Sequence, residues 1–213
     1  MKLKPILLLL AIFLPAMFSC KKKDKEGPVV TLKGDAVITV ILNTSYTDPG
    51  ADAFDNNDGT VAIDITGEVN TDFAGVYSIV YSAYDKAGNQ GEAVRTVIVK
   101  NESENFTGNY AAKCYTPNDT VGYFAPLVVS TMVNKRVWLG GFAAFSNASV
   151  FADISNDTIR FPNQLAEAGN PPAIHKFAGS GLISFSNDST IFKINFTDSV
   201  SGNISNGYLV YKK

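Results

Sequence analysis

The chain has 213 residues, of which 46% are hydrophobic, 18% charged and 11% aromatic. This composition is too apolar for a disordered protein and suffices for one large or two small globular domains. The formal net charge is −2 and the body of the chain has no lysine or arginine stretch, which excludes nucleic acid as a partner. One histidine and two cysteines are too few for a zinc site or a disulfide scaffold.

A short apolar run opens the chain. Lys2 and Lys4 precede it, and Ser19 and Cys20 follow it. The run is shorter than the roughly 18–20 residues that a spanning helix needs, so residues 1–19 are predicted to be a signal peptide that is removed. One interpretation is an ordinary signal peptide, in which Cys20 is incidental. The alternative is a signal peptide that directs lipidation of Cys20.

Cys20 after a small residue resembles the lipobox of bacterial lipoproteins, in which the thiol carries acyl chains such as palmitate and becomes the mature amino terminus. The resemblance implies an outer-membrane lipoprotein, facing the cell surface or the periplasm, whose membrane partner is reached through lipid. Residues 20–27 would be the acylated cysteine and a charged tether that buries no apolar surface.

Residues 28–100 alternate short β-rich runs with turn clusters. Tyr77, Ile79, Tyr81 and Ala83 fall on one face of a strand by the period of two. About seven short strands in this length predict a small β-sandwich. The clearest runs cover residues 29–32, 37–42, 61–65, 76–84 and 94–99.

Several motifs in this region have a familiar arrangement: Tyr46-Thr47-Asp48-Pro49-Gly50-Ala51, Asp55 through Asp58-Gly59, Gly75-Val76-Tyr77, and Tyr81 through Asp85-Lys86-Ala87-Gly88-Asn89. They resemble the bacterial surface-protein Ig-like domain, related to the hyalin-repeat type and widespread in exported Bacteroidetes proteins. That resemblance implies a spacer or adhesive unit and no catalytic residues. Asn43 stands where the family usually has glycine.

Acidic residues in the turns of this region suggest calcium as the one candidate cofactor. Asp48, Asp52, Asp55, Asp58 and Asp85 offer hard oxygen ligands, although their spacing does not match an EF-hand. Turn chemistry is the favoured interpretation, because Asp and Asn cap their own backbone and Gly adopts positive φ. An interloop calcium site is the alternative.

Residues 105–213 are predicted to form a second all-β domain. About eight candidate strands, separated by turns, predict an antiparallel barrel-like or sandwich domain. They cover residues 109–114, 122–133, 136–145, 148–154, 158–161, 175–186, 191–197 and 208–211. A short helix is expected over residues 164–168, stopped by Gly169 and the following prolines.

Glycines inside these strands, at 140–141 and at 179 and 181, indicate bends or close backbone approach, as in a closing barrel. Patches at residues 106–110, 158–164 and 207–211 resemble lipocalin-like β-domains that follow Ig-like modules in Bacteroidetes lipoproteins. The resemblance implies architecture rather than activity.

Three aromatic residues are candidates for ligand binding: Trp138, Phe142 and Tyr123. An aromatic face can stack on a sugar or contact a lipid chain, whereas ordinary core packing is the alternative. His175 and Cys114 are expected to be structural, since neither has a catalytic partner in the sequence.

Four Asp-Ser/Thr-apolar sequences resemble the acceptor of the general O-glycosylation system of Bacteroidetes exported proteins. The acceptor hydroxyls would be those of Thr120, Thr158, Ser189 and Ser199. Turns that precede a strand explain the same placement without modification.

These observations predict an exported, membrane-anchored lipoprotein that binds or displays without catalysis, with glycan or other surface proteins as partners. A lipocalin-like carrier of a small apolar molecule is the alternative, as is a purely structural or adhesive spacer. A hydrolase using Asp153 and Asp157 is disfavoured, because nothing in the sequence places the two carboxylates in one cleft.

Overall fold

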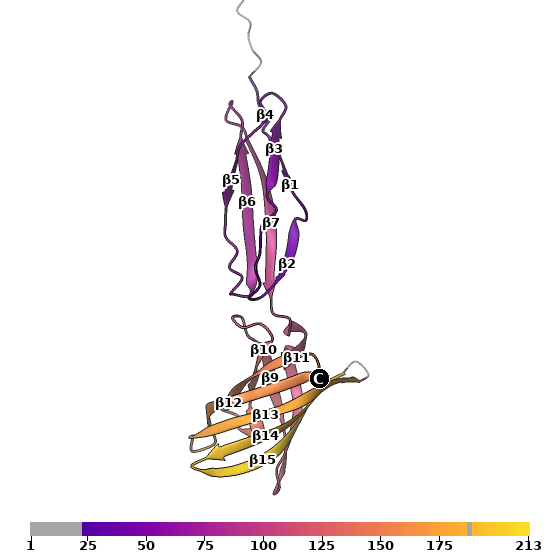
Figure 1. The fold of residues 1–213 in the computed structure, drawn as a ribbon, viewed down its shortest axis with the longest axis vertical. Helices are drawn as coiled ribbons and strands as arrows, with labels where there is room; N and C mark the ends of the chain where they lie inside the picture. Colours follow the sequence, from indigo (N-terminus) through magenta and orange to yellow (C-terminus); the bar gives the residue numbers. More distant parts are fainter. Residues whose placement is uncertain (1–22, 187–188) are drawn as a thin grey trace, which may run out of the picture.

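The computed structural model describes residues 23–186 and 189–213, and over these ranges it consists of strands with two single-turn 3-10 helices. Figure 1 shows two bodies end to end, a sandwich formed by β1–β7 and a barrel formed by β8–β15. The first described residues meet the sandwich beside β4, at the end farthest from the barrel. The predicted all-β fold class is confirmed. Within the described ranges, no helix is long and apolar enough to cross a membrane.

Two sheets form the sandwich, one in the order β1-β3-β4 and the other in the order β2-β7-β6-β5. β2 runs parallel to β7, and the remaining neighbours are antiparallel. The strands are β1 (Val29–Leu32), β2 (Val37–Ile41), β3 (Ala51–Asp55), β4 (Gly59–Thr60), β5 (Ile63–Thr66), β6 (Gly75–Tyr84) and β7 (Gln90–Lys100). The sequence pattern did not locate β3 and β4, because β3 mixes alanine with aspartate and β4 has two residues.

The buried face of β6 is the predicted one. Ile79, Tyr81 and Ala83 are at most 5% exposed, whereas Val76 on the opposite face is 70% exposed. Ile79 and Tyr81 pack with Val97 and Val99 of β7 and with apolar residues of the other sheet. The period-two pattern therefore places the sandwich core correctly.

A buried charge lies beside this core. Arg95 is fully buried, and its Nη1 donates hydrogen bonds to Asp48 Oδ2 (2.6 Å) and to the hydroxyl of Tyr81 (2.8 Å). Its other N–H groups donate to three backbone carbonyl oxygens. Desolvation opposes ionisation of Asp48, but hydrogen bonds from Tyr81, Arg95 and Tyr46 lower the pKa of its carboxyl group to about 2. Asp48 is therefore a structural partner of Arg95.

Eight antiparallel strands close into the barrel, each paired with its neighbour in sequence, and β8 also pairs with β15. They are β8 (Gly108–Tyr115), β9 (Thr120–Val129), β10 (Arg136–Gly140), β11 (Ser149–Ser155), β12 (Thr158–Ala168), β13 (Ala173–Ser186), β14 (Ser189–Val200) and β15 (Asn203–Lys212). The barrel alternative of the predicted second domain is confirmed. The exact domain boundaries at 28–100 and 105–213 stay predictions.

Aromatic rings fill the barrel centre. After β10 the chain turns inward through the 3-10 helix η2 (Phe142–Ala144), and the Phe142 ring lies 5.0–5.5 Å from the rings of Phe161, Phe177 and Phe196. Ala143 and Ala144 adopt positive φ angles of 54° and 68°, which is unfavourable for alanine. Burial of Phe142 offsets this strain, because a fully buried aromatic side chain contributes a few kcal/mol.

Two predictions about local structure were wrong. Residues 164–168 form the second half of β12 rather than a helix, because the segment pairs with β13 from Gln164 to Ala168 after a register shift that accommodates Pro162. The predicted strand over residues 136–145 ends at Gly140, because Gly141 adopts a left-handed φ of 66° that starts the inward turn. In the first case strand pairing overrides local helix propensity, and in the second a glycine turn ends the strand.

The glycines of β13 have the predicted role of close backbone approach. A Cβ atom on Gly181 would lie 2.1 Å from the Lys193 carbonyl oxygen of β14, and one on Gly179 would lie 2.5 Å from that of Asn195. Only glycine fits at these two positions without moving the neighbouring backbone.

Loops of the sandwich and the barrel are joined by hydrogen bonds. Asn101, which is 2% exposed, donates from Nδ2 to the carbonyl oxygens of Ser130 and Val133 (both 2.9 Å). Asn43 donates to Met132 O (3.1 Å) and accepts from Asn134 N (2.8 Å). Asn43 has a left-handed φ of 63°, a conformation that glycine and asparagine adopt more readily than other residues.

Candidate functional site

An exposed aromatic residue marks the outer wall of the barrel at β10. Val137 and Leu139 point inward and are fully buried, so the alternation of the strand places Trp138 outside, where it is 43% exposed. Trp138 lies opposite Phe151 of β11 and Val128 of β9. The rings of Trp138 and Phe151 are 5.5 Å apart at an angle of 62°, an edge-to-face arrangement.

An ion pair adjoins these rings. Arg136 Nε and Nη2 donate to the two carboxylate oxygens of Asp153, at 2.7 and 3.0 Å. The guanidinium carbon lies 4.0 Å from the centroid of the Phe151 ring, and the hydrogen bond to Asp153 raises the pKa of Arg136. We call Arg136, Trp138, Phe151 and Asp153 the Trp138 platform.

Hydrogen bonds from β12 hold the platform in place. Gln164 Nε2 donates to Phe151 O (2.7 Å), and Phe151 N donates to Gln164 Oε1 (2.9 Å). The amide side chain thereby replaces backbone pairing beyond the Asp153–Arg160 pair, where the ladder between β11 and β12 ends. The platform is an amphipathic surface with an aromatic side, formed by Trp138 and Phe151, and a planar charged side, formed by Arg136 and Asp153.

The three predicted ligand residues do not form one site. Phe142 is fully buried at the barrel centre, which agrees with the alternative interpretation of core packing. Tyr123 is half-buried, and its hydroxyl lies 3.1 Å from that of Tyr211. Sequence reasoning missed Arg136, Phe151 and Asp153 as neighbours of Trp138, because their proximity depends on the register between β10 and β11.

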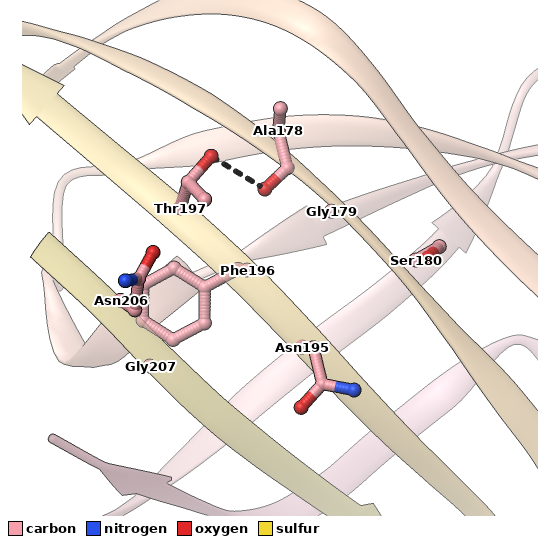
Figure 2. Close-up of a pocket in the computed structure, with 8 residues that line it drawn as sticks. All are labelled: Ala178, Gly179, Ser180, Asn195, Phe196, Thr197, Asn206 and Gly207. Carbon is pink, nitrogen blue, oxygen red and sulfur yellow. Dashed lines mark hydrogen bonds between the residues drawn. The ribbon is translucent and has the colours of Figure 1, made fainter. Parts of the chain in front are cut away.

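A shallow hollow of about 410 Å³ lies over β13, β14 and β15. Figure 2 shows the polar side chains around it, with Thr197 donating a hydrogen bond of 3.4 Å to the carbonyl oxygen of Ala178. Gly179 and Gly207 flank Phe196 in the paired strands, so the hollow arises where side chains are missing. It is lined by Ala178, Gly179, Ser180, Asn195, Phe196, Thr197, Asn206 and Gly207.

A second hollow, of about 570 Å³, lies at β8, β9 and β15 and has a largely apolar wall. Phe124, which is 81% exposed, and the predicted ligand residue Tyr123 contribute to it. The ammonium-bearing side chains of Lys113 and Lys212 also line it. It suits a small apolar molecule with an acidic end better than the aromatic-filled barrel centre does.

The acidic candidates of the sandwich separate into different environments. Asp52 forms an exposed ion pair with Lys33 (2.7 Å), and the half-buried Asp58 forms an ion pair with the exposed Lys86 (3.0 Å). Asp55 and Asp85 are buried and lie together with Asp24, a residue that was assigned only to the tether. The structure thus brings together two of the predicted calcium residues and adds one.

The residues considered for catalysis occupy structural positions. His175 Nδ1 lies 2.8 Å from Asp198 Oδ1, and both side chains are buried. Asp153 is engaged by Arg136, which leaves it unsuited to act with Asp157 as a pair of acid and base groups. Cys114 is 2% exposed, as predicted, and desolvation raises the pKa of its thiol.

The modification candidates differ in location. Cys20 lies outside the described residues. Thr120, Thr158 and Ser189 are the first residues of β9, β12 and β14. Ser199 lies inside β14, paired with Ile204, and follows Asp198, whose side chain is buried beside His175. The turn interpretation therefore does not hold for Ser199, and glycosylation at all four hydroxyls stays a prediction.

Comparison with solved structures finds proteins of low sequence identity. The lipoprotein BT2262 from Bacteroides thetaiotaomicron is 18% identical, with 86% of this chain and 98% of that chain covered and a TM-score of 0.35. A Bacteroides ovatus protein of unknown function is 10% identical, with coverages of 90% and 81% and a TM-score of 0.41. The CBM51-2 and INT domains of Clostridium perfringens ZmpB, solved with GlcNAc, are 15% identical, with coverages of 86% and 43% and a TM-score of 0.29.

These TM-scores lie below 0.5, so the three similarities assign no function to this chain. No curated protein matches it. One family does match, and it matches the sandwich: the family described as bacterial surface protein, Ig-like domain, covers residues 30–99. This range contains nearly all of β1–β7, including the Arg95–Asp48 pair and the turns that carry Asp55 and Asp85. The first body of this chain is therefore a bacterial surface-protein Ig-like domain.

Proposed function

We propose that this protein is a non-catalytic surface lipoprotein that binds a glycan at the Trp138 platform. The observation that carries the proposal is the exposed indole of Trp138 next to the planar Arg136–Asp153 pair. A pyranose offers one face of C–H groups, which packs on an aromatic ring, and a rim of hydroxyl groups, which pairs with planar charged groups. The platform presents both kinds of contact on one wall.

The arrangement of the bodies supports display away from a membrane. The sandwich separates the N-terminal segment from the barrel (Figure 1). Acyl chains on Cys20 would hold the amino terminus in the outer membrane, because each buried methylene contributes about 0.8 kcal/mol. The barrel, with its platform, would then be the outermost part of the protein, available to glycan or to other surface proteins.

Intrinsic fluorescence offers a direct test of glycan binding, because Trp138 is the single tryptophan of the chain. Glycans that bind on an array are titrated against the protein while the emission of Trp138 is recorded. We expect a shift in emission on binding and a loss of affinity of about tenfold in Arg136→Lys, which keeps the charge but loses bidentate pairing.

Matched aromatic variants locate the site. Trp138→Ala should abolish retention on the same glycan, whereas Phe185→Ala, which removes another exposed aromatic residue (70% exposed) from the barrel, should leave retention unchanged. Equal retention by Trp138→Ala and the parent protein, or no binding to any glycan of a broad array, would contradict the proposal.

The anchor is tested separately by mass spectrometry of the mature amino terminus. Acyl mass on Cys20 is expected in the parent protein and its loss in Cys20→Ala. A membrane-bound Cys20→Ala product without acyl mass would refute the lipoprotein assignment.

The apolar hollow at β8, β9 and β15 favours a second candidate function, the carrier of a small apolar molecule. Its wall is apolar, and two lysines line it, which suits a fatty acid. A thermal-shift screen with fatty acids tests this candidate, and Gly122→Leu, which fills the hollow, should abolish any shift. Stabilisation by fatty acids without any glycan binding would favour the carrier over the glycan-binding protein.

A further inference from the structure

Three carboxylates meet at the end of the sandwich farthest from the barrel. Asp24 comes from the segment before β1, Asp55 from the end of β3, and Asp85 from the turn after β6. One carboxylate oxygen of each lies within 4.8 Å of those of the other two. Segments that are 31 and 30 residues apart in sequence thus converge on one point, which local turn chemistry does not require.

Asp55 is the buried member of this cluster and has an oxygen without a partner. The residue is 1% exposed, and its Oδ1 accepts hydrogen bonds from the backbone N–H groups of Asn57 (2.8 Å) and Asp58 (2.9 Å). Its Oδ2 is buried and, among the residues that the structure describes, accepts no hydrogen bond. A buried anionic oxygen without a donor is costly, and such atoms in native proteins usually contact an ion or water.

The other two carboxylates do not supply a counter-charge. Asp85 is 7% exposed, and its oxygens accept hydrogen bonds from Asn89 N (2.7 Å) and Asn89 Nδ2 (2.6 Å). Asp24 accepts from Glu26 N and Asn57 Nδ2. Over residues 23–186 and 189–213, none of the ion pairs includes any of the three carboxylates. The three carboxylates therefore lie next to one another, and the hydrogen bonds that they accept come from neutral donors.

We propose that Asp24, Asp55 and Asp85 bind a calcium ion. Calcium bonds oxygen at about 2.3–2.6 Å, so oxygens on opposite sides of one ion are separated by roughly 4.8 Å. The spread of the three carboxylate oxygens in this cluster fits that span without rearrangement. A divalent cation also offsets most of the repulsion among the three charges and gives Asp55 Oδ2 the partner that it otherwise lacks.

The ion has a structural consequence for the attachment of the protein. Asp24 belongs to the charged segment between the amino terminus and β1, whereas Asp55 and Asp85 belong to the rigid sandwich. Calcium would therefore fasten this segment to the sandwich and stiffen the base of the molecule, where a lipid-anchored protein would otherwise pivot. This role is independent of glycan binding, because the cluster and the Trp138 platform belong to different bodies.

Calorimetric titration of the full chain in detergent with CaCl2 tests the site. We expect saturable binding with a dissociation constant on the order of 0.1–1 mM, as in extracellular calcium modules, and weaker binding of MgCl2. Asp24→Asn should weaken calcium binding at least tenfold. Asp24 is half-buried and lies before β1, outside both hydrophobic cores, so this variant tests the site without disturbing the fold. Asp52→Asn carries the same charge change in an exposed ion pair outside the cluster, and should bind like the parent protein.

Proteolysis localises the effect. Lys23 and Lys25 flank Asp24 and are exposed, so endoproteinase Lys-C should cleave after them several times more slowly in CaCl2 than in chelator. Asp24→Asn should lose this protection, and Asp52→Asn should keep it. Absence of binding heat at 10 mM CaCl2, equal binding of MgCl2, or calcium binding by Asp24→Asn equal to that of the parent protein would each overturn the proposal.

Discussion

The buried pair of Arg95 and Asp48 predicts a pH-dependent contribution to stability that Asp48→Asn removes. The substitution keeps an oxygen acceptor and the shape of the side chain but deletes the negative charge beside a fully buried guanidinium. The native pKa of Asp48 is about 2, against an ordinary value of 3.8. A difference of this size corresponds to about 2 kcal/mol, and the unpaired buried charge of Arg95 adds to the loss. We expect the free energy of unfolding to fall by roughly 2–4 kcal/mol at pH 7.

The sign follows from a native pKa that is lower than the unfolded one. The stabilisation by ionised Asp48 is fully present above about pH 5 and is lost as the pH falls through 3.8 toward 2. The difference in free energy of unfolding between the parent protein and Asp48→Asn should therefore become smaller as the pH falls over this range.

Urea denaturation followed by far-UV circular dichroism measures this difference at pH 7 and at pH 3. Trp138 emission reports the barrel separately, because the single tryptophan lies there. Asp52→Asn is the control, since its ion pair with Lys33 is 53–73% exposed and such pairs contribute at most about 1 kcal/mol. Two results would refute this account of the Arg95–Asp48 pair. One is a loss in free energy of unfolding at pH 7 that is no greater in Asp48→Asn than in Asp52→Asn. The other is a loss in Asp48→Asn that does not shrink at low pH.

Three further substitutions test the packing of the barrel and its joint. Phe142→Ala should reduce the free energy of unfolding of the barrel by about 3–5 kcal/mol, measured by Trp138 emission in urea. Leu165→Ala, at an exposed position, is the control, and an equally small loss in Phe142→Ala would contradict a packed barrel centre. Gly181→Ala should destabilise the barrel far more than Gly122→Ala, because the new Cβ meets backbone at 2.1 Å in the first case and only at 4.0 Å in the second. Thermal melting compares the two variants, and equal midpoints would argue against the close approach of β13 and β14. Asn101→Ala removes the buried hydrogen bonds of its side chain with Ser130 O and Ser103 N, and should cost about 2–4 kcal/mol, with earlier proteolysis at the joint. Cleavage at the rate of the parent protein would show that this side chain does not hold the bodies together.

Periodicity in the sequence was sufficient for the sandwich core and the number of barrel strands. Tyr77, Ile79, Tyr81 and Ala83 fall on one face by the period of two, with Ser78 and Ser82 on the other, and the buried face of β6 follows from that alternation. The same method failed at residues 164–168. These residues are good helix formers, but they lie in β12 because their backbone N–H and C=O groups pair with β13.

The candidate sites were less accessible to sequence reasoning. Trp138 is predicted from the sequence together with Phe142 and Tyr123, but its neighbours in the structure, Phe151 and Asp153, depend on which residues of β11 face it. Asp55 and Asp85 were found among many acidic turn residues, whereas Asp24 was assigned to a tether because nothing local distinguishes it.

The amino-acid sequence by itself determined that this chain is built of strands, where many of its turns lie and which faces are apolar, because side-chain alternation and turn chemistry act over a few residues. Only the tertiary structure decided that the barrel closes around Phe142, that Arg136 and Asp153 flank Trp138, and that three carboxylates meet at the base of the sandwich. These features depend on the pairing of distant segments, and register between strands is set by packing of the whole body rather than by any one strand.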